Sequence, residues 1–150
     1  MKRLILPLTL LLLLLLSTSD LLAQKEVYDM IGKKMNNVIK TFGKPTYHDK
    51  SNPDLECIFY QTKDHRIAFV GNQNGIYQVE KCVFYNGKNA ASNSFTQMLK
   101  KCCQKGFEVD SLDTYEYELK YSGITMNLSL YENSVLNKFE VRIKASGNEG

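Results

Sequence analysis

Apolar and polar residues alternate along three successive segments in the second half of the chain. The segments are Thr114–Tyr121, Gly123–Leu130 and Lys138–Lys144. A period of two places successive side chains on opposite faces, so each segment predicts a strand with one buried and one exposed face. Turn-forming residues separate them, at Ser122–Gly123 and at Glu132–Ser134. We expect these strands to form an antiparallel meander.

A segment with helical period precedes these strands. Apolar residues recur at positions i, i+3, i+4 and i+7, namely Phe95, Met98, Leu99 and Cys102. Ser94 and Gln97 form a capping-box pattern, and Gly106 is placed to end the helix. The segment therefore predicts an amphipathic helix that covers the apolar face of the meander.

The first half of the chain repeats this order of elements. The apolar residues Met35, Val38, Ile39 and Phe42 have the same helical spacing, each 60 positions before its counterpart. Strands are then predicted at Leu55–Gln61, His65–Gly71 and Ile76–Tyr85. A constant offset favours an internal repeat. We expect an α+β fold in which residues 24–88 and 89–150 each form a helix plus a three-stranded antiparallel meander. Both helices should pack on one face of the sheet, in one compact globular unit.

The N-terminal residues predict export. Met1–Arg3 is positively charged, Leu4–Leu16 is almost entirely apolar, and small and polar residues follow. This run of about thirteen residues is shorter than the roughly twenty needed to span a bilayer. We expect residues 1–23 to be a signal peptide and the mature chain to be periplasmic or extracellular, without a transmembrane segment. The first cysteine is Cys57, so no lipid anchor on a cysteine at the cleavage site is expected.

Net charge narrows the range of partners. The 150 residues include 19 Lys and Arg and 16 Asp and Glu, which gives a formal net charge of +3. Nucleic-acid binding needs a strongly basic face that releases phosphate counterions. We therefore expect no nucleic-acid partner.

The segment Ile31–Pro45 carries a family resemblance. Its predicted helix closes with Phe42, Gly43, Lys44 and Pro45, and a polar loop and the aromatic strand CIFYQ follow. This segment resembles the helical opening of the SmpA/OmlA (BamE) family of outer-membrane assembly proteins. A tandem of two such units is similar to the beta-lactamase inhibitor protein (BLIP)-like fold family. The resemblance implies helices on one face of an antiparallel sheet, with the opposite face or the loops available to bind proteins.

Few residues suggest catalysis or metal binding. The two histidines are His48, in a polar loop with Asp49 and Asp54, and His65, in a predicted turn. No HExxH, CxxC or GxSxG pattern occurs. The loop cluster is an alternative cation site, although a solvated loop is the simpler interpretation. We expect a protein that is not an enzyme and has no cofactor and no metal, with a small secreted hydrolase as a third hypothesis.

The predicted strands of the first half are apolar on both faces. Such a strand is either buried on both sides or exposes an apolar patch that a partner covers. Because aromatic anchors dominate interface energetics, the second interpretation predicts a protein-binding surface. Its candidate residues are Ile58, Tyr60, Tyr77 and Phe84. The expected partner is another protein, bound through the sheet face and loops. The alternative is a carrier that holds a small apolar molecule or lipid between helices and sheet.

Four cysteines lie in the part of the chain expected to be exported: Cys57, Cys82, Cys102 and Cys103. An oxidising compartment and an even count favour disulfides. Geometry disfavours a bond between the neighbours Cys102 and Cys103. Two connectivities then remain, Cys57 with Cys102 and Cys82 with Cys103, or the reverse crossing. Alternatively, Cys102 is a small core residue at the position where the first helix has Phe42.

Overall fold

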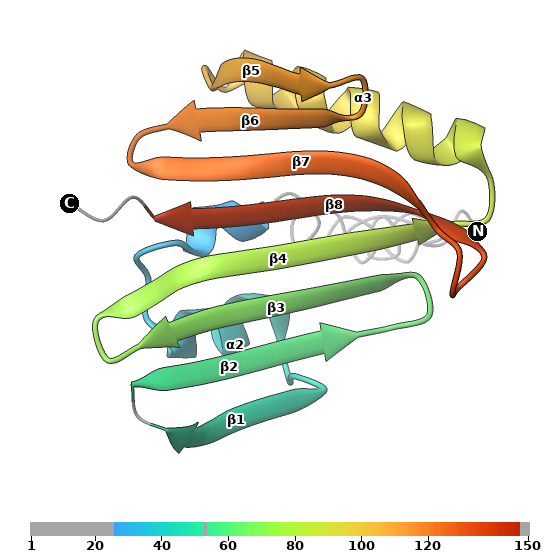
Figure 1. Ribbon diagram of the computed structural model, residues 1–150. Coiled ribbons are helices and arrows are strands. Elements are labelled where there is room, and N and C mark those ends of the chain that lie inside the picture. Colours follow the sequence, from blue (N-terminus) through green and yellow to red (C-terminus); the bar gives the residue numbers. More distant parts are fainter. Residues whose placement is uncertain (1–25, 53, 148–150) are drawn as a thin grey trace, which may run out of the picture.

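The computed structural model describes residues 26–52 and 54–147, and one eight-stranded antiparallel sheet dominates this part (Figure 1). The strand order is β1-β2-β3-β4-β8-β7-β6-β5. The strands are β1 (Tyr47–Asn52), β2 (Leu55–Gln61), β3 (His65–Asn72), β4 (Gly75–Tyr85), β5 (Glu108–Asp113), β6 (Glu116–Tyr121), β7 (Ile124–Asn133) and β8 (Lys138–Gly147). The predicted signal peptide, residues 1–23, lies outside the described residues.

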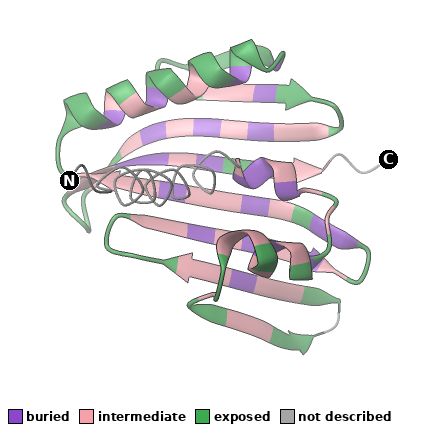
Figure 2. Ribbon diagram, turned by 180° about the vertical axis from the view of Figure 1, so that it is seen from behind, coloured by how far each residue is buried: buried purple, intermediate pink, exposed green. Residues whose placement is uncertain are grey.

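All described helices lie on one face of the sheet (Figures 1 and 2). They are the 3-10 helix η1 (Val27–Met30) and the α-helices α2 (Met35–Phe42) and α3 (Lys88–Gln104). None of the helices in residues 26–52 and 54–147 has the length and apolar character that a bilayer crossing needs. The opposite face of the sheet carries no described helix. We call this helix-free side the open face.

Two clusters of buried side chains fill the space between helices and sheet. The cluster of the first half consists of Val27, Met30, Met35, Val38, Ile58, Ile67, Phe69, Ile76 and Val79. The cluster of the second half consists of Tyr28, Ala91, Phe95, Cys102, Phe107, Leu119, Met126, Leu128, Leu130, Val141, Ile143 and Ala145. The short helix η1 contributes to both clusters and so joins the two halves of the core.

The expected fold of two helix-plus-three-strand repeats is wrong. Helices α2 and α3 are each followed by four strands, and the two runs join through β4 and β8 into a single sheet. The protein is therefore mostly sheet. The unpredicted strands β1 and β5 form the two edges of the sheet. Because edge strands bury few side chains, β1 and β5 have no alternation of apolar residues, and every residue of β5 is exposed.

The ends of α3 differ in how well they follow the sequence pattern. The helix begins at Lys88, with Gly87 as its N-cap, six residues before the predicted capping box at Ser94. It ends near Gly106, which has a φ of +91°, as expected for a glycine that closes a helix. The N–H of Phe107 then donates to the Cys102 carbonyl at 3.1 Å.

A close backbone contact ties the link between η1 and α2 to the start of β4. The Gly32 N–H donates to the Ile76 carbonyl at 2.7 Å, and the Ile76 N–H donates to the Lys33 carbonyl at 2.9 Å. Gly75 precedes this contact with a φ of +143°, and a Cβ there would lie 3.0 Å from the Gly32 carbonyl oxygen. Only glycine permits this approach without strain.

Candidate functional site

The open face carries an apolar area over the first-half strands β1, β2 and β3. Residues directly opposite each other on neighbouring strands share a face. Phe59 is paired with Tyr47 on one side and with Ala68 on the other, and the Tyr47 and Phe59 rings lie 6.0 Å apart. Cys57 is paired with Val70 on the same side. The second half of the chain does not stack on these side chains, because it joins the sheet edge to edge at β4 and β8.

A buried carboxylate lies near the centre of the open face. Glu140 is only 1% exposed, although it faces away from the helices. Arg142 donates to its Oε1 from Nε at 3.1 Å and from Nη2 at 3.0 Å, and Asn133 donates to its Oε2 at 3.1 Å. Arg142 also contacts the hydroxyl of Tyr131, whose ring it covers at 4.9 Å from the centroid. These contacts compensate for the removal of the charge from water.

Hydrogen bonding sets the charge state of this cluster. Burial raises the pKa of Glu140, but hydrogen bonds from Tyr131, Cys82 and other neighbours outweigh it, so the pKa lies below its ordinary value. The neighbouring thiol of Cys82 shifts in the opposite direction. Burial, together with the hydrogen bond to Glu140 and its charge, raises the pKa of Cys82 to about 12. Cys82 is therefore protonated at neutral pH and unsuited to nucleophilic chemistry.

A second acid connects this cluster to β3. Glu80 lies 3.5 Å from Nη2 of Arg66 and 3.9 Å from Nε of Arg142. Arg66 and Arg142 flank Cys82 on the paired strands β3, β4 and β8. The open face therefore combines two arginines with an adjacent apolar area.

The structure does not bring the four predicted binding residues together. Ile58 is fully buried beneath α2, and Tyr60 lies on the same helix-covered face. The Tyr60 ring packs against Phe42, and its hydroxyl donates to the Gly43 carbonyl at 2.8 Å. The proposed roles of Ile58 and Tyr60 in a surface are therefore corrected to roles in the core.

The other two predicted binding residues are accessible. Tyr77 is 39% exposed and lies where the pairing of β3 with β4 shifts register. Phe84 is half-buried on the open face, directly opposite Glu140. Of the four predicted residues, Phe84 is the one that the strand pairing places on the open face.

The expected helix-to-sheet disulfides are not present. All four cysteines are free thiols: Cys57, Cys82, Cys102 and Cys103. Cys57 and Cys82 face the open side, whereas α3 carries its two cysteines on the opposite side, with the sheet between them. Cys102 is buried in the core, as the alternative interpretation expected, and burial and the charge of Glu26 raise its pKa to about 11.

The polar loop cluster does not form a cation site. His48 and Asp49 lie in β1, and Nε2 of His48 is 2.6 Å from Oε1 of Glu56. Asp49 instead accepts a hydrogen bond from the Ser51 N–H at 2.9 Å. Among residues 26–52 and 54–147, no three His, Cys, Asp or Glu side chains are grouped so that they could hold a metal ion.

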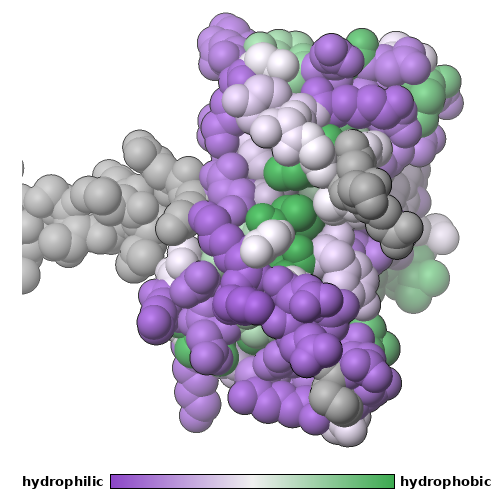
Figure 3. Space-filling view, turned by 90° about the vertical axis from the view of Figure 1, so that its left-hand side faces the viewer, coloured by the Kyte–Doolittle hydropathy of each residue, from purple (hydrophilic) through white to green (hydrophobic). Residues whose placement is uncertain are grey.

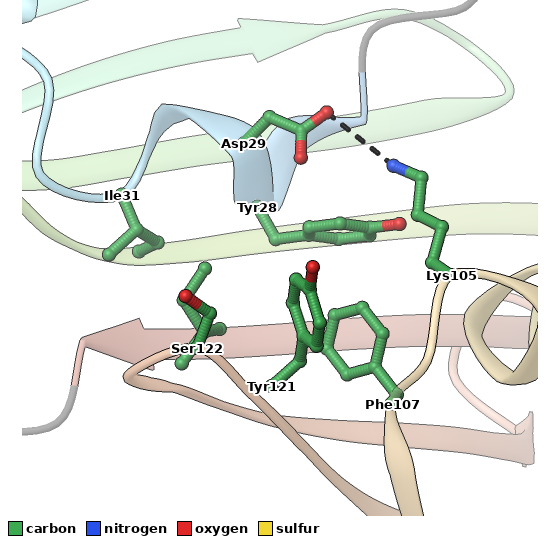
Figure 4. Close-up of a pocket in the computed structure, with 8 residues that line it drawn as sticks. Tyr28, Asp29, Ile31, Lys105, Phe107, Tyr121 and Ser122 are labelled. Carbon is green, nitrogen blue, oxygen red and sulfur yellow. Dashed lines mark ion pairs between the residues drawn. The ribbon is translucent and has the colours of Figure 1, made fainter.

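An aromatic pocket opens at one end of the helix-covered side. It has a volume of about 440 Å³ and lies between η1, the end of α3 and the turn from β6 to β7. Its lining residues are Tyr28, Asp29, Ile31, Lys105, Phe107, Tyr121, Ser122 and Ile124 (Figure 4). Figure 3 views this end of the molecule and shows hydrophobic residues in its centre between hydrophilic flanks.

Three rings form the wall of the aromatic pocket. The Phe107 ring centroid lies 5.5 Å from that of Tyr28 and 5.1 Å from that of Tyr121. At the rim, Lys105 lies 3.7 Å from an Asp29 carboxylate oxygen and 4.9 Å from the Tyr28 ring centroid (Figure 4). Sequence reasoning missed this pocket because it depends on η1, whose four residues are too few to show a helical period.

Comparisons with known proteins show the fold but no family. No family model matches the chain, and no curated protein matches it. An extracellular protein containing a SCP domain from Bacillus anthracis has a similar solved structure, with a TM-score of 0.50 and 12% sequence identity, over 82% of this chain and 46% of that chain. A cysteine-rich secretory protein from Staphylococcus aureus aligns with a TM-score of 0.48 and 10% identity, over 83% of this chain and 47% of that chain. The chain therefore spans about half the length of both structures.

The expected resemblance to the SmpA/OmlA (BamE) and BLIP-like families is wrong. The similar fold is found in a protein with a SCP domain, and each half of this sheet has four strands where three were expected. The motif that suggested the resemblance is a local helix ending. Gly43 has a φ of +81° and donates its N–H to the Ile39 carbonyl at 2.9 Å. Many short helices end in this way, so the motif does not specify a family.

Proposed function

We propose that this chain is an exported, non-enzymatic binding protein that recognises another protein through its open face. The signal-peptide pattern of residues 1–23 supports export. The observation that carries the binding role is the composition of the open face. Aromatic and aliphatic side chains, among them Phe59 and Val70, share this face with Arg66 and Arg142, and no described helix covers it. Aromatic residues and arginines are the side chains enriched at the energetic centres of protein interfaces.

A pair of matched variants tests this proposal. Val70→Lys places a charge in the apolar half of the open face, and Asn127→Lys places the same charge in its polar half; both positions are half-buried. Immobilised wild-type, Val70→Lys and Asn127→Lys proteins are exposed to the same envelope and culture-medium fractions. Mass spectrometry then quantifies the retained proteins.

We expect a protein that is retained by the wild type and by Asn127→Lys and lost from Val70→Lys. Tyr47→Lys, at a side chain that is 59% exposed, provides a second apolar-half variant if Val70→Lys unfolds. Equal retention by all variants, or no specific retention, contradicts the proposal.

The aromatic pocket favours a second candidate function, the binding of a small apolar molecule. Its volume of about 440 Å³ lies in the range of small-molecule sites, and its rings supply an apolar wall. Native mass spectrometry of the purified protein should then show a bound ligand. Tyr121→Lys should release this ligand, whereas Lys120→Gln, at the neighbouring exposed position, should retain it. A wild-type protein without bound ligand speaks against this second function.

A further inference from the structure

A basic pocket lies at one end of the open face, between the turn from β2 to β3 and the hairpin from β7 to β8. It has a volume of about 350 Å³. Its lining residues are Gln61, Thr62, Lys63, Arg66, Phe84, Leu136 and Lys138. Nζ of Lys138 donates to the Lys63 carbonyl at 3.4 Å, which connects the hairpin to the turn although 75 positions separate the two residues. The pocket is therefore built from segments that only the folded sheet brings together.

The charge of the lining residues is of one sign. Lys63, Arg66 and Lys138 line the pocket, and its described lining includes no carboxylate. Arg66 forms an ion pair with Glu80, whose Oε1 lies 3.5 Å from Nη2, and the same nitrogen lies 3.6 Å from the Cys82 sulfur. Both of these long contacts use the same terminal nitrogen of Arg66. Within the described part of the chain, the other N–H groups of the guanidinium can therefore donate to a ligand. A carboxylate is the ligand group that such a fork of donors recognises best.

An apolar wall adjoins the cations. Phe84 and Leu136 line the same pocket, and Leu136 is 50% exposed. A volume of about 350 Å³ is at the lower end of the range for ligand sites, so it suits one apolar side chain with its carboxylate rather than a helix or a folded surface. The last residue of a polypeptide carries both groups on a single Cα, and capture of a C-terminal carboxylate is a known mode of peptide recognition.

We propose that this pocket binds the C-terminal residue of the partner protein, with its carboxylate against the three cations and its apolar side chain against Phe84 and Leu136. This inference rests on the proposed function, because the pocket lies on the same open face and shares Phe84 with it. It specifies the partner as a protein whose chain ends in an accessible apolar residue.

Three peptides test the chemistry. They are N-acetyl-Gly-Ser-Gly-Leu with a free carboxylate, the same peptide with a C-terminal amide, and N-acetyl-Gly-Ser-Gly-Lys with a free carboxylate. Calorimetry measures the affinity, and backbone amide NMR shifts locate the site on the full mature protein. We expect the free leucine peptide to bind about tenfold more tightly than its amide, since a charge-assisted hydrogen bond is lost. The shifts should centre on Lys63, Leu136 and Lys138.

Variants assign the binding to this pocket. Lys63→Gln, at an exposed turn position, should weaken binding of the leucine peptide several-fold without affecting the fold. Phe84→Ala should reduce the preference for leucine over lysine. Lys144→Gln, an exposed cation on the polar half of the open face, is the matched control and should leave the affinity unchanged. Equal binding of acid and amide, shifts centred on the aromatic pocket, or no binding overturns the proposal.

The outcomes also separate this inference from the proposed function. If the peptides do not bind but Val70→Lys still loses a partner that Asn127→Lys retains, the open face binds protein and the C-terminal recognition is wrong. If the free leucine peptide binds here while the open-face variants retain the same proteins, the pocket is a peptide site and the broader face has no role in partner binding.

Discussion

Arg142 donates two hydrogen bonds to the buried carboxylate of Glu140, from Nε at 3.1 Å and from Nη2 at 3.0 Å. The side chain of Glu140 is 1% exposed, whereas that of Arg142 is 36% exposed. The arginine therefore connects a charge that is shielded from water to the surface of the open face. Both residues lie on β8, which pairs with β4 of the first half, so this cluster lies where the two halves of the sheet meet.

Replacing the arginine should destabilise the fold. Arg142→Met leaves Glu140 buried without its cationic partner. We expect the free energy of unfolding to fall by about 2–3 kcal/mol, which is less than for a fully buried pair because the arginine is partly exposed. Lys144→Met, two residues along the same strand and exposed, is the control and should change stability by less than about 0.5 kcal/mol. Urea denaturation measures both values. Equal changes in the two variants would show that the pair of Arg142 and Glu140 makes no specific contribution to stability.

Acid should weaken the same cluster. The folded-state pKa of Glu140 is below its ordinary value of 4.5, so the native state stabilises the ionised form. This contribution is present at pH values above the unfolded-state pKa and is lost as pH falls through the lowered native pKa. We expect the stability of the wild type to decrease below pH 4.5, and its advantage over Glu140→Gln to shrink over the same range. Thermal unfolding from pH 7 to pH 2 measures both proteins. A difference that stays constant with pH contradicts this explanation.

The thiols should differ in reactivity. Cys103 is exposed, whereas Cys82 and Cys102 are buried, and their pKa values are raised to about 12 and about 11. With iodoacetamide at pH 8, we expect alkylation of Cys103 first, slower reaction of the half-buried Cys57, and protection of the buried pair until urea is added. Peptide mapping without reductant should find all four thiols alkylated after unfolding. A disulfide-linked peptide would contradict this prediction and show that these cysteines form a cross-link.

A glycine substitution tests the contact between η1, α2 and β4. Gly75→Ala adds a Cβ 3.0 Å from the Gly32 carbonyl oxygen at a φ of +143°. We expect destabilisation of about 2 kcal/mol or more, since both the backbone conformation and the contact are incompatible with a side chain. Gly87→Ala meets open space at a negative φ and should cost less than about 1 kcal/mol. Guanidinium denaturation compares the two variants, and equal midpoints contradict the role of this contact.

The sequence pattern predicted the inner strands and helices but not the edges of the sheet. Residues such as Leu119 and Met126 alternate with polar residues because one face of β6 and β7 is buried, and this burial imposes the period of two. Strands β1 and β5 are held mainly by backbone hydrogen bonds, which any residue type can make, so their composition is that of a loop. The pairing of β4 with β8 joins distant segments, and no local pattern encodes it.

The site was only partly predictable for a similar reason. The apolar residues on both sides of β2 predict that both faces of this strand are covered, by the core or by a partner. They do not show which face the helices cover. The pattern therefore predicts Ile58 on the surface, whereas the structure buries it in the core cluster beneath α2. Glu140 belongs to the polar set of β8 by its alternation, and its burial results from side chains on the neighbouring strand, including Tyr131 and Asn133.

Strand β5 forms one end of the strand order and exposes all of its residues. Edge strands present backbone donors and acceptors on which another sheet can grow. Here Glu108, Asp110 and Asp113 lie along that edge, so two copies that approach through β5 bring carboxylates together. The repulsion between these like charges opposes the growth of one sheet onto another through the β5 edge.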